Sequence, residues 1–261
     1  MLKKTNYMKY ILFILVSLLL FTSCLPPHYV HAPLITSDIE NKGDYTISGG
    51  VDVSTESKNF NVNSNYAITD HVIVQASATY AKNHSDLKDY NSNGKSIDVA
   101  VGYTNISSDK HFYIENFMGY GHGNFNNIHF EDNTRYANFS YDKFFAQLNL
   151  NYRTHNYDED INTFSFHIPI RLAYVNYNKI AFTSLGNFSL GSQIEHLREN
   201  PRRLMLSTGK TISYRFDNVK LNLFASYTTP TKATELLTFG YLYVGFGVSW
   251  RNFLKKKKRT N

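Results

Sequence analysis

Apolar and polar residues alternate strictly along residues 59–83, and this pattern predicts a β-hairpin. On the first arm Phe60, Val62 and Tyr66 share one face, while asparagines occupy much of the other. The second arm, 72–83, repeats the alternation after the short connection 69–71. A period of two residues is typical of a strand with one apolar and one polar face. The same unit recurs along most of the chain.

Ten segments carry this strand pattern, which predicts an all-β fold. They cover residues 43–54, 59–68, 72–83, 96–104, 111–123, 144–152, 162–177, 203–215, 219–227 and 241–250. The sixth segment has a less regular start between 136 and 143, where we expect a bulge. Pro169 is unusual in the seventh because it cannot donate to a strand ladder. For residues 203–215 the pattern does not show which side chains point inward, since neither the odd nor the even positions are consistently apolar.

The connections between these segments alternate in length. Those at 69–71, 105–110, 155–160 and 216–218 are short, those at 81–95, 122–135, 178–202 and 228–238 are long, and only 55–58 breaks the alternation. Transmembrane barrels have short periplasmic turns and longer external loops. The sequence therefore predicts a closed antiparallel up-and-down transmembrane β-barrel of about ten strands, with eight or twelve as alternatives. An even strand number places both chain ends on the periplasmic side.

The chain begins with a predicted lipoprotein signal peptide at residues 1–23. Three lysines precede an apolar run, 10–21, that is shorter than the roughly 20 residues of a membrane-spanning helix. It ends in Thr22-Ser23-Cys24, which is similar to a lipobox, so we expect cleavage before Cys24 and acylation of that residue. The alternative is an ordinary thiol beside an ordinary cleavage site. As the only cysteine, it can form no internal disulfide.

The remaining boundaries follow from composition. Residues 24–42 contain three prolines without periodicity and are predicted to be a periplasmic tether, 43–253 the barrel, and 254–261 a basic tail. The formal net charge is +6, but without the three signal lysines and the five basic residues of the tail, 19 basic residues face 21 acidic ones. This balance argues against a nucleic-acid partner. The tail is either a solvated end or a contact for anionic lipid head groups.

Ionisable residues on the predicted inward faces are the candidates for function. They are Asp44, Asp52, Asp98, Glu115, His167, Arg171 and Lys220. Because buried charges need partners, we expect a lumen charge network of Asp98, Glu115, His167, Arg171 and Lys220 that plugs the barrel. A Glu115–Arg171 pair is its predicted centre.

The alternative to a plug is a narrow polar pore. The glycines predicted to leave room for one are Gly102, Gly119, Gly121, Gly245 and Gly247, and the aromatic residues that would fill it are Tyr113, Phe117, Tyr241 and Tyr243. A barrel of this size is only somewhat wider than eight-stranded barrels whose side chains fill the interior. The choice between plug and pore therefore depends on how these side chains pack.

Residues with catalytic potential lie near the predicted external rim: His122, His129, Asp132 and Ser140. Their spacing matches neither a hydrolase motif nor a metal site. We expect no catalytic residue, cofactor or metal, and interpret this stretch as a solvated loop. Residues 192–200 in the longest connection are predicted to form a short helix that ends at Pro201.

Several short motifs resemble those of the small outer-membrane β-barrel lipoproteins of Bacteroidota. They are the lipobox cysteine, His31-Ala32-Pro33-Leu34, Lys42-Gly43 at the start of a strand, Tyr66-Ala67-Ile68-Thr69-Asp70-His71 at a turn, and Gly119-Tyr120-Gly121. The resemblance implies a barrel in the bacterial outer membrane and no catalytic residues.

Together, the pattern and the resemblance predict a non-enzymatic outer-membrane lipoprotein with a structural or surface-binding role and membrane lipids as partners. The alternatives are a lipid-anchored soluble ligand-binding barrel, a narrow diffusion pore, and a lipid-modifying or proteolytic barrel. In a soluble barrel the apolar face of 162–177 would have to point inward around a ligand.

Overall fold

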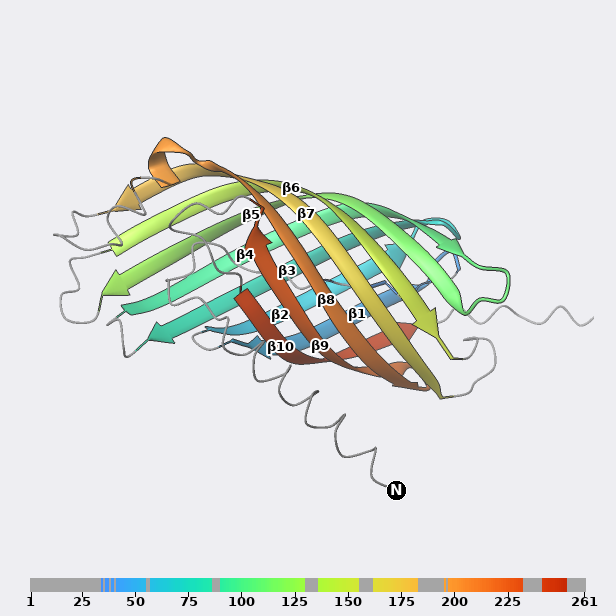
Figure 1. Ribbon diagram of the computed structural model, residues 1–261. Coiled ribbons are helices and arrows are strands. Elements are labelled where there is room, and N and C mark those ends of the chain that lie inside the picture. The colour runs from blue at the N-terminus through green and yellow to red at the C-terminus, as the bar shows by residue number, and fades with distance from the viewer. Residues whose placement is uncertain are drawn as a thin grey trace, which may run out of the picture.

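The computed structural model describes residues 34, 36, 37, 39, 41–54, 57–85, 90–129, 136–154, 162–182, 195, 197–231 and 241–252. Within them, ten antiparallel strands close into a tilted barrel (Figure 1). Strands adjacent in sequence pair with each other, and β1 pairs with β10 to close the sheet. The strands are β1 (Tyr45–Val53), β2 (Ser57–Ala67), β3 (Val72–Ser85), β4 (Tyr90–Ile106), β5 (Phe112–His129), β6 (Tyr136–Arg153), β7 (Thr163–Phe182), β8 (Arg202–Phe216), β9 (Val219–Pro230) and β10 (Tyr241–Asn252). The predicted fold class and strand number are confirmed.

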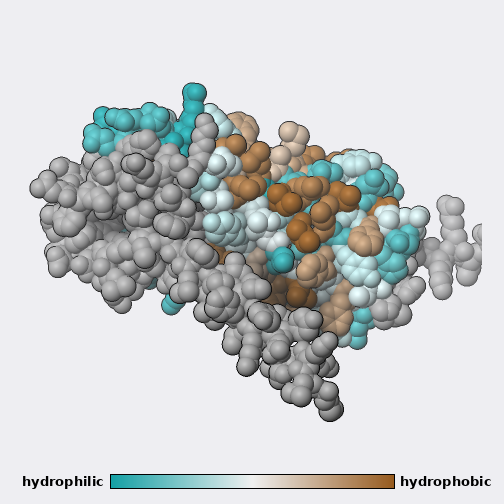
Figure 2. Space-filling model, in the orientation of Figure 1, coloured by the Kyte–Doolittle hydropathy of each residue, from teal (hydrophilic) through white to brown (hydrophobic). Residues whose placement is uncertain are grey.

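The barrel is polar inside and apolar outside. Along β2 every second residue is buried, and the buried set includes Asn59, Asn61, Asn63 and Asn65. Exposed apolar side chains occur on the outer face of all ten strands and form an apolar band. Figure 2 shows some of them as brown atoms on one face of the barrel. Water would disfavour such a surface, whereas lipid favours it. The band therefore identifies a transmembrane barrel.

The soluble-barrel alternative required the apolar face of the seventh segment to point inward, and the structure contradicts it. Phe164 and Leu172 are 54% and 44% exposed on the outer face of β7, while Ser165, His167 and Arg171 are buried in the lumen. The inward positions of β7 thus carry the polar groups, as the membrane-barrel prediction required.

Aromatic side chains gather at both edges of the apolar band. Near the short turns, Tyr45 packs edge-on against Trp250 with ring centroids 5.4 Å apart. Toward the other edge, Tyr120 packs against Phe144 with centroids 5.2 Å apart. Girdles of this kind mark the two lipid–water interfaces of membrane barrels.

Two connections predicted to be long loops are largely strand. β3 and β4 stay paired as far as Ser85 and Tyr90, and β5 and β6 as far as Ile128 and Tyr136, so 81–95 and 122–135 are mostly hairpin arms. Beyond the apolar band the outer face no longer meets lipid, so the alternation fades although the backbone pairing continues. Residues 195 and 197–199, before Pro201, are helical as predicted.

The structure decides the facing of β8. Met205, Ser207, Thr211 and Arg215 point inward, while Leu204, Leu206 and Ile212 are exposed outside. The sequence pattern was ambiguous because Thr208 and Lys210 also lie on the outer face. A lysine at the bilayer midplane of a barrel costs about 2–4 kcal/mol, which is why lipid-facing strands rarely carry one.

Two irregularities lie along β7. The register shifts between Ser140 and Tyr141, as expected near the start of β6. The extra residue, which has no register partner on the other strand, is Asn178 of β7. The β7–β8 pairing passes from His167↔Thr211 to Ile170↔Thr208 around Pro169, whose carbonyl accepts a 3.2 Å hydrogen bond from the Thr208 hydroxyl. Proline removes a ladder donor, which explains the local break.

Among the described residues, no helix is long and apolar enough to cross a membrane.

Candidate functional site: the filled lumen

The described N-terminal residues lie inside the barrel. Ser37 and Ile39 are 1% and 2% exposed, and the Ser37 amide donates to Glu115 Oε1 at 3.2 Å while its hydroxyl donates to the same carboxylate. The Thr46 hydroxyl donates to the Ser37 carbonyl at 3.3 Å. The prediction of 24–42 as a periplasmic tether is therefore wrong for residues 34–39 where they are described. The lumen supplies buried acceptors, and this non-periodic segment supplies donors to them.

Glu115 does not pair with Arg171, so the predicted central pair is wrong. Its carboxylate accepts hydrogen bonds from Asn149 at 2.8 Å and Asn151 at 3.4 Å, in addition to those from Ser37. The register explains the difference. Glu115 lies level with Asn149, whereas Arg171 lies level with Gln147, one inward position further along the strand.

Instead, a buried ion cluster centred on Asp98 lies on the inner face of the barrel wall and spans several neighbouring strands. Lys143 Nζ lies 2.9 Å and Arg171 Nη1 3.6 Å from its carboxylate oxygens, and all three side chains are at most 4% exposed. Gly121 of β5 lies between β4 and β6, and a Cβ there would overlap both Asp98 and Lys143. The missing side chain allows the two charges to meet across β5.

Arg171 is fixed on two further sides. Its Nε donates to Gln147 Oε1 at 2.8 Å, and its guanidinium lies 4.5 Å from the centre of the Phe145 ring. Buried charges are tolerated when paired and hydrogen-bonded in this way. The cluster therefore holds β4, β6 and β7 in one arrangement across the lumen.

His167 and Lys220 point inward and are buried, as predicted. His167 Nδ1 lies 2.8 Å from the Asn151 side-chain oxygen, so Asn151 connects it to Glu115. The five predicted residues thus fall into three groups: Asp98 with Arg171, Glu115 with His167 through Asn151, and Lys220 elsewhere in the lumen. Only the tertiary structure separates them.

Among the described residues, four buried cations of the lumen were not predicted: Lys143, Arg153, Arg215 and Arg251. Arg251 Nη2 lies 2.7 Å from Asp44 Oδ2 and joins the start of β1 to the end of β10. Lys143, Arg153 and Arg251 lie one residue beyond the ends of predicted strand segments. Arg215 lies in the segment 203–215, whose inward face the sequence pattern did not identify. The sequence did contain a signal for two of these cations. Phe144 and Trp250 face outward, so continuing the alternation by one residue places Lys143 and Arg251 on the inward face.

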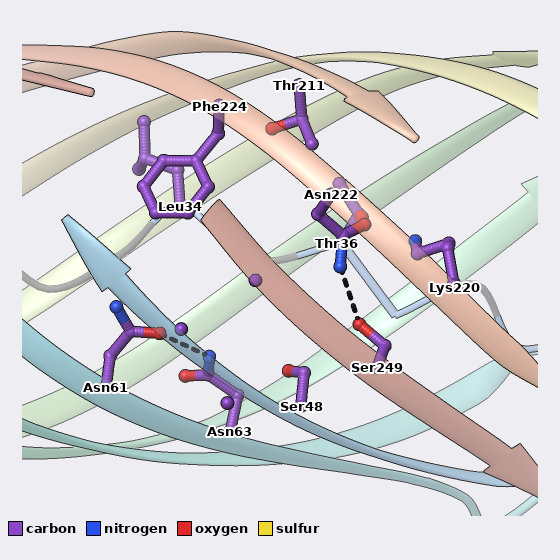
Figure 3. A pocket seen from close by; sticks show the side chains of 13 residues that line it. Leu34, Thr36, Ser48, Asn61, Asn63, Thr211, Lys220, Asn222, Phe224 and Ser249 are labelled. Carbon is purple, nitrogen blue, oxygen red and sulfur yellow. Dashed lines mark hydrogen bonds between the residues drawn. The ribbon is translucent and has the colours of Figure 1, made fainter. Parts of the chain in front are cut away.

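A small cavity remains beside the N-terminal segment. Its volume is ≈ 60 Å³, and Leu34, Thr36, Lys220 and Phe224 are among its lining residues (Figure 3). Asn222 donates to the Ser249 hydroxyl at 2.8 Å across one wall. Such a volume holds a few water molecules and no larger solute.

The narrow pore considered as the alternative to a plug is not supported at most of the inward glycines, because aromatic rings occupy the space above them. A Cβ at Gly102 would overlap the ring of Phe117, and one at Gly119 would overlap that of Phe145. In each case the glycine and the aromatic residue are direct partners on adjacent strands. Glycine here makes room for a neighbouring ring.

The end of the lumen opposite the short turns is closed by an apolar cluster. Phe125, Phe139, Tyr141 and Tyr177 are buried there, with the Tyr141 and Tyr177 rings 5.7 Å apart. Leu197, from the helical residues before β8, is 3% exposed in the same cluster. This closure was not predicted, since much of it comes from the hairpin arms beyond the membrane.

Of the four rim residues considered for catalysis, only His122 and Ser140 have described side chains, and His122 pairs with Asp142, which was not in that set. His122 Nδ1 lies 2.9 Å from Asp142 Oδ1, and Tyr120 and Asn178 each donate to the same carboxylate at 2.5 Å. The Asp142 carboxylate therefore links β5, β6 and β7 on the outer face. The His129 side chain and Asp132 lie outside the described residues. In the described part of the chain, no three His, Cys, Asp or Glu residues are placed to hold a metal ion.

Fold and lumen together define a transmembrane β-barrel with a filled interior. No family model matches the chain, and no curated protein sequence is significantly similar to it. Among solved structures it is similar to the N-terminal barrel domain of Pseudomonas aeruginosa OprF (11% identity, 82% of this chain and 100% of that chain, TM-score 0.33). It is also similar to Yersinia pestis Ail (10%, 81% and 99%, TM-score 0.33) and to the Escherichia coli outer-membrane protease OmpT (7%, 81% and 94%, TM-score 0.40). At these identities the similarity concerns the barrel fold alone.

Proposed function

We propose that the protein is a non-enzymatic lipoprotein of the bacterial outer membrane whose closed barrel has a structural or surface-binding role. The observation that carries this proposal is the filled lumen. Polar hydrogen bonds around Glu115, the ion cluster around Asp98 and the aromatic cluster with Leu197 occupy successive levels of the interior. Within the described residues, a lumen filled in this way leaves no path for solutes through the barrel.

Planar-bilayer recording tests the closed lumen. We expect no steady conductance from the wild-type protein, because hydrogen-bonded, charged and aromatic side chains fill the described part of the lumen. Deleting residues 34–39 should produce brief openings, since Leu34 and Thr36 line the cavity and Ser37 is hydrogen-bonded to Glu115 in the lumen. Deleting 254–259 removes the same number of residues and serves as the control. A large and steady wild-type conductance would instead establish a diffusion pore.

The lipid anchor forms the second part of the proposal. Cys24 follows an apolar run and small residues in the order required for lipoprotein processing. Cells fed radiolabelled palmitate should label the wild-type protein, whereas Cys24→Ser should carry no label at equal expression. Equal labelling of both proteins would exclude Cys24 as the acylated residue. The short turns, the start of β1 and the end of β10 all lie at one side of the barrel. Because periplasmic turns are short, we propose that the side of Asp44 and Arg251 faces the periplasm.

A further inference from the structure

Three lysines form a cluster on the outer surface of β2, β3 and β4, just beyond the apolar band. Lys58 and Lys82 are direct cross-strand partners, and Lys95 partners Tyr80, two residues before Lys82. All three side chains are exposed. Direct partners have Cβ atoms about 5 Å apart and diagonal neighbours about 7–8 Å apart. The three ammonium groups can therefore converge on one small anion.

This cluster has no internal counter-charge among the described residues. The acidic residues of β2–β5 are Asp98 and Glu115, and both are buried in the lumen. No ion pair or hydrogen bond of the three lysine side chains occurs within the part of the chain that the structure describes. Like charges directly opposite each other destabilise a sheet. An external anion would remove that cost.

An apolar groove lies on the same strands, deeper in the lipid-facing band. It has a volume of ≈ 510 Å³, and its outer-face lining includes Ser64, Ala76, Val99 and Tyr120. Those four residues form a row of register partners across β2–β5. Ala76 and Lys82 are six residues apart on β3, or about 20 Å along the strand. An extended acyl chain spans a similar length.

We propose that this surface binds a phosphorylated glycolipid of the outer leaflet, with a phosphate on Lys58, Lys82 and Lys95 and an acyl chain in the groove. The inference rests on the proposed orientation, which places the lysines at the level of the external head groups. Charge complementarity selects this occupant. A second copy of the chain would present the same cationic surface and no acid from β2–β5, and a neutral lipid would leave the lysines without a counter-ion.

Native mass spectrometry of the full chain in detergent tests the proposal, with bisphosphorylated lipid A as the probe. The wild-type protein should retain the lipid, and the lipid should raise the temperature at which the folded band is lost on gels. Lys58→Gln/Lys82→Gln/Lys95→Gln should weaken binding about one hundredfold, at about 1 kcal/mol for each lysine near an anionic surface. Ala76→Trp should also weaken it, because the indole fills the groove.

The matched control is Lys42→Gln/Lys210→Gln, which removes exposed lysines elsewhere and should leave lipid binding unchanged. Lys82→Gln alone should raise the lipid-free unfolding temperature by removing the opposed charge, yet reduce the increase that lipid A produces. This opposite sign separates lipid binding from a general loss of stability. It also provides a readout if the triple variant does not fold.

Three outcomes would overturn the inference. They are equal lipid A binding by the wild type and the triple variant, an equal increase in unfolding temperature from inorganic phosphate or dephosphorylated lipid A, and a dimer that the triple variant loses. None of them depends on conductance or on acylation of Cys24. A failure here is therefore distinguishable from a failure of the proposed function.

Discussion

An Asp98→Asn substitution is expected to lower the free energy of unfolding by about 3–5 kcal/mol, the usual cost of removing one partner from a buried ion pair. The change preserves the shape of the side chain but removes the negative charge that Lys143 and Arg171 share, at distances of 2.9 and 3.6 Å. Urea titration of the protein in lipid vesicles measures the effect. Fluorescence of Trp250, the single tryptophan, reports unfolding.

Two further variants make this result specific. Asp98→Asn/Lys143→Met should recover part of the loss, because an apolar side chain replaces the buried lysine that faced Asp98. Asp217→Asn, at an exposed turn position with φ 51°, should change stability by less than about 0.5 kcal/mol, since asparagine tolerates that conformation. If Asp98→Asn and Asp217→Asn have equal effects, the cluster does not stabilise the barrel.

A Gly119→Val substitution is expected to cost up to about 3 kcal/mol, near the upper end of the usual range for overpacking. A Cβ at this position would lie 2.6 Å from the Val99 carbonyl oxygen and would also overlap the ring of Phe145. The backbone oxygen is held in the β4–β5 ladder and cannot move away. The same urea titration measures the loss.

Gly49→Val is the matched control for that substitution. The nearest atom to a Cβ at Gly49 is the Asn61 carbonyl oxygen at 3.8 Å, so the valine meets no obstacle. Valine also suits a strand better than glycine does. Stability should stay within about 0.5 kcal/mol of the wild type. A comparable loss of stability in both variants would show that replacing any strand glycine is costly, and that overlap with the packed ring is not the cause.

The sequence by itself determined the strands, their number and most of their facing. Lipid outside and a polar lumen inside force each spanning residue to one of two environments, so alternation such as that from Phe60 to Tyr66 identifies a strand and its orientation. The pattern failed where that constraint is absent. Above the apolar band the arms of β5 and β6 were interpreted as loop, and around Lys210 the outer face of β8 is not uniformly apolar.

Only the tertiary structure decided how the lumen is filled. Alternation places Asp98, Glu115 and Arg171 on inward faces, but strand register sets which of them lie level, and register is not encoded in the alternation of one strand. The position of Ser37 was equally hidden, because a short segment without periodicity does not indicate whether it lies in water or in the lumen. It lies inside because the Glu115 carboxylate is buried there and requires hydrogen-bond donors.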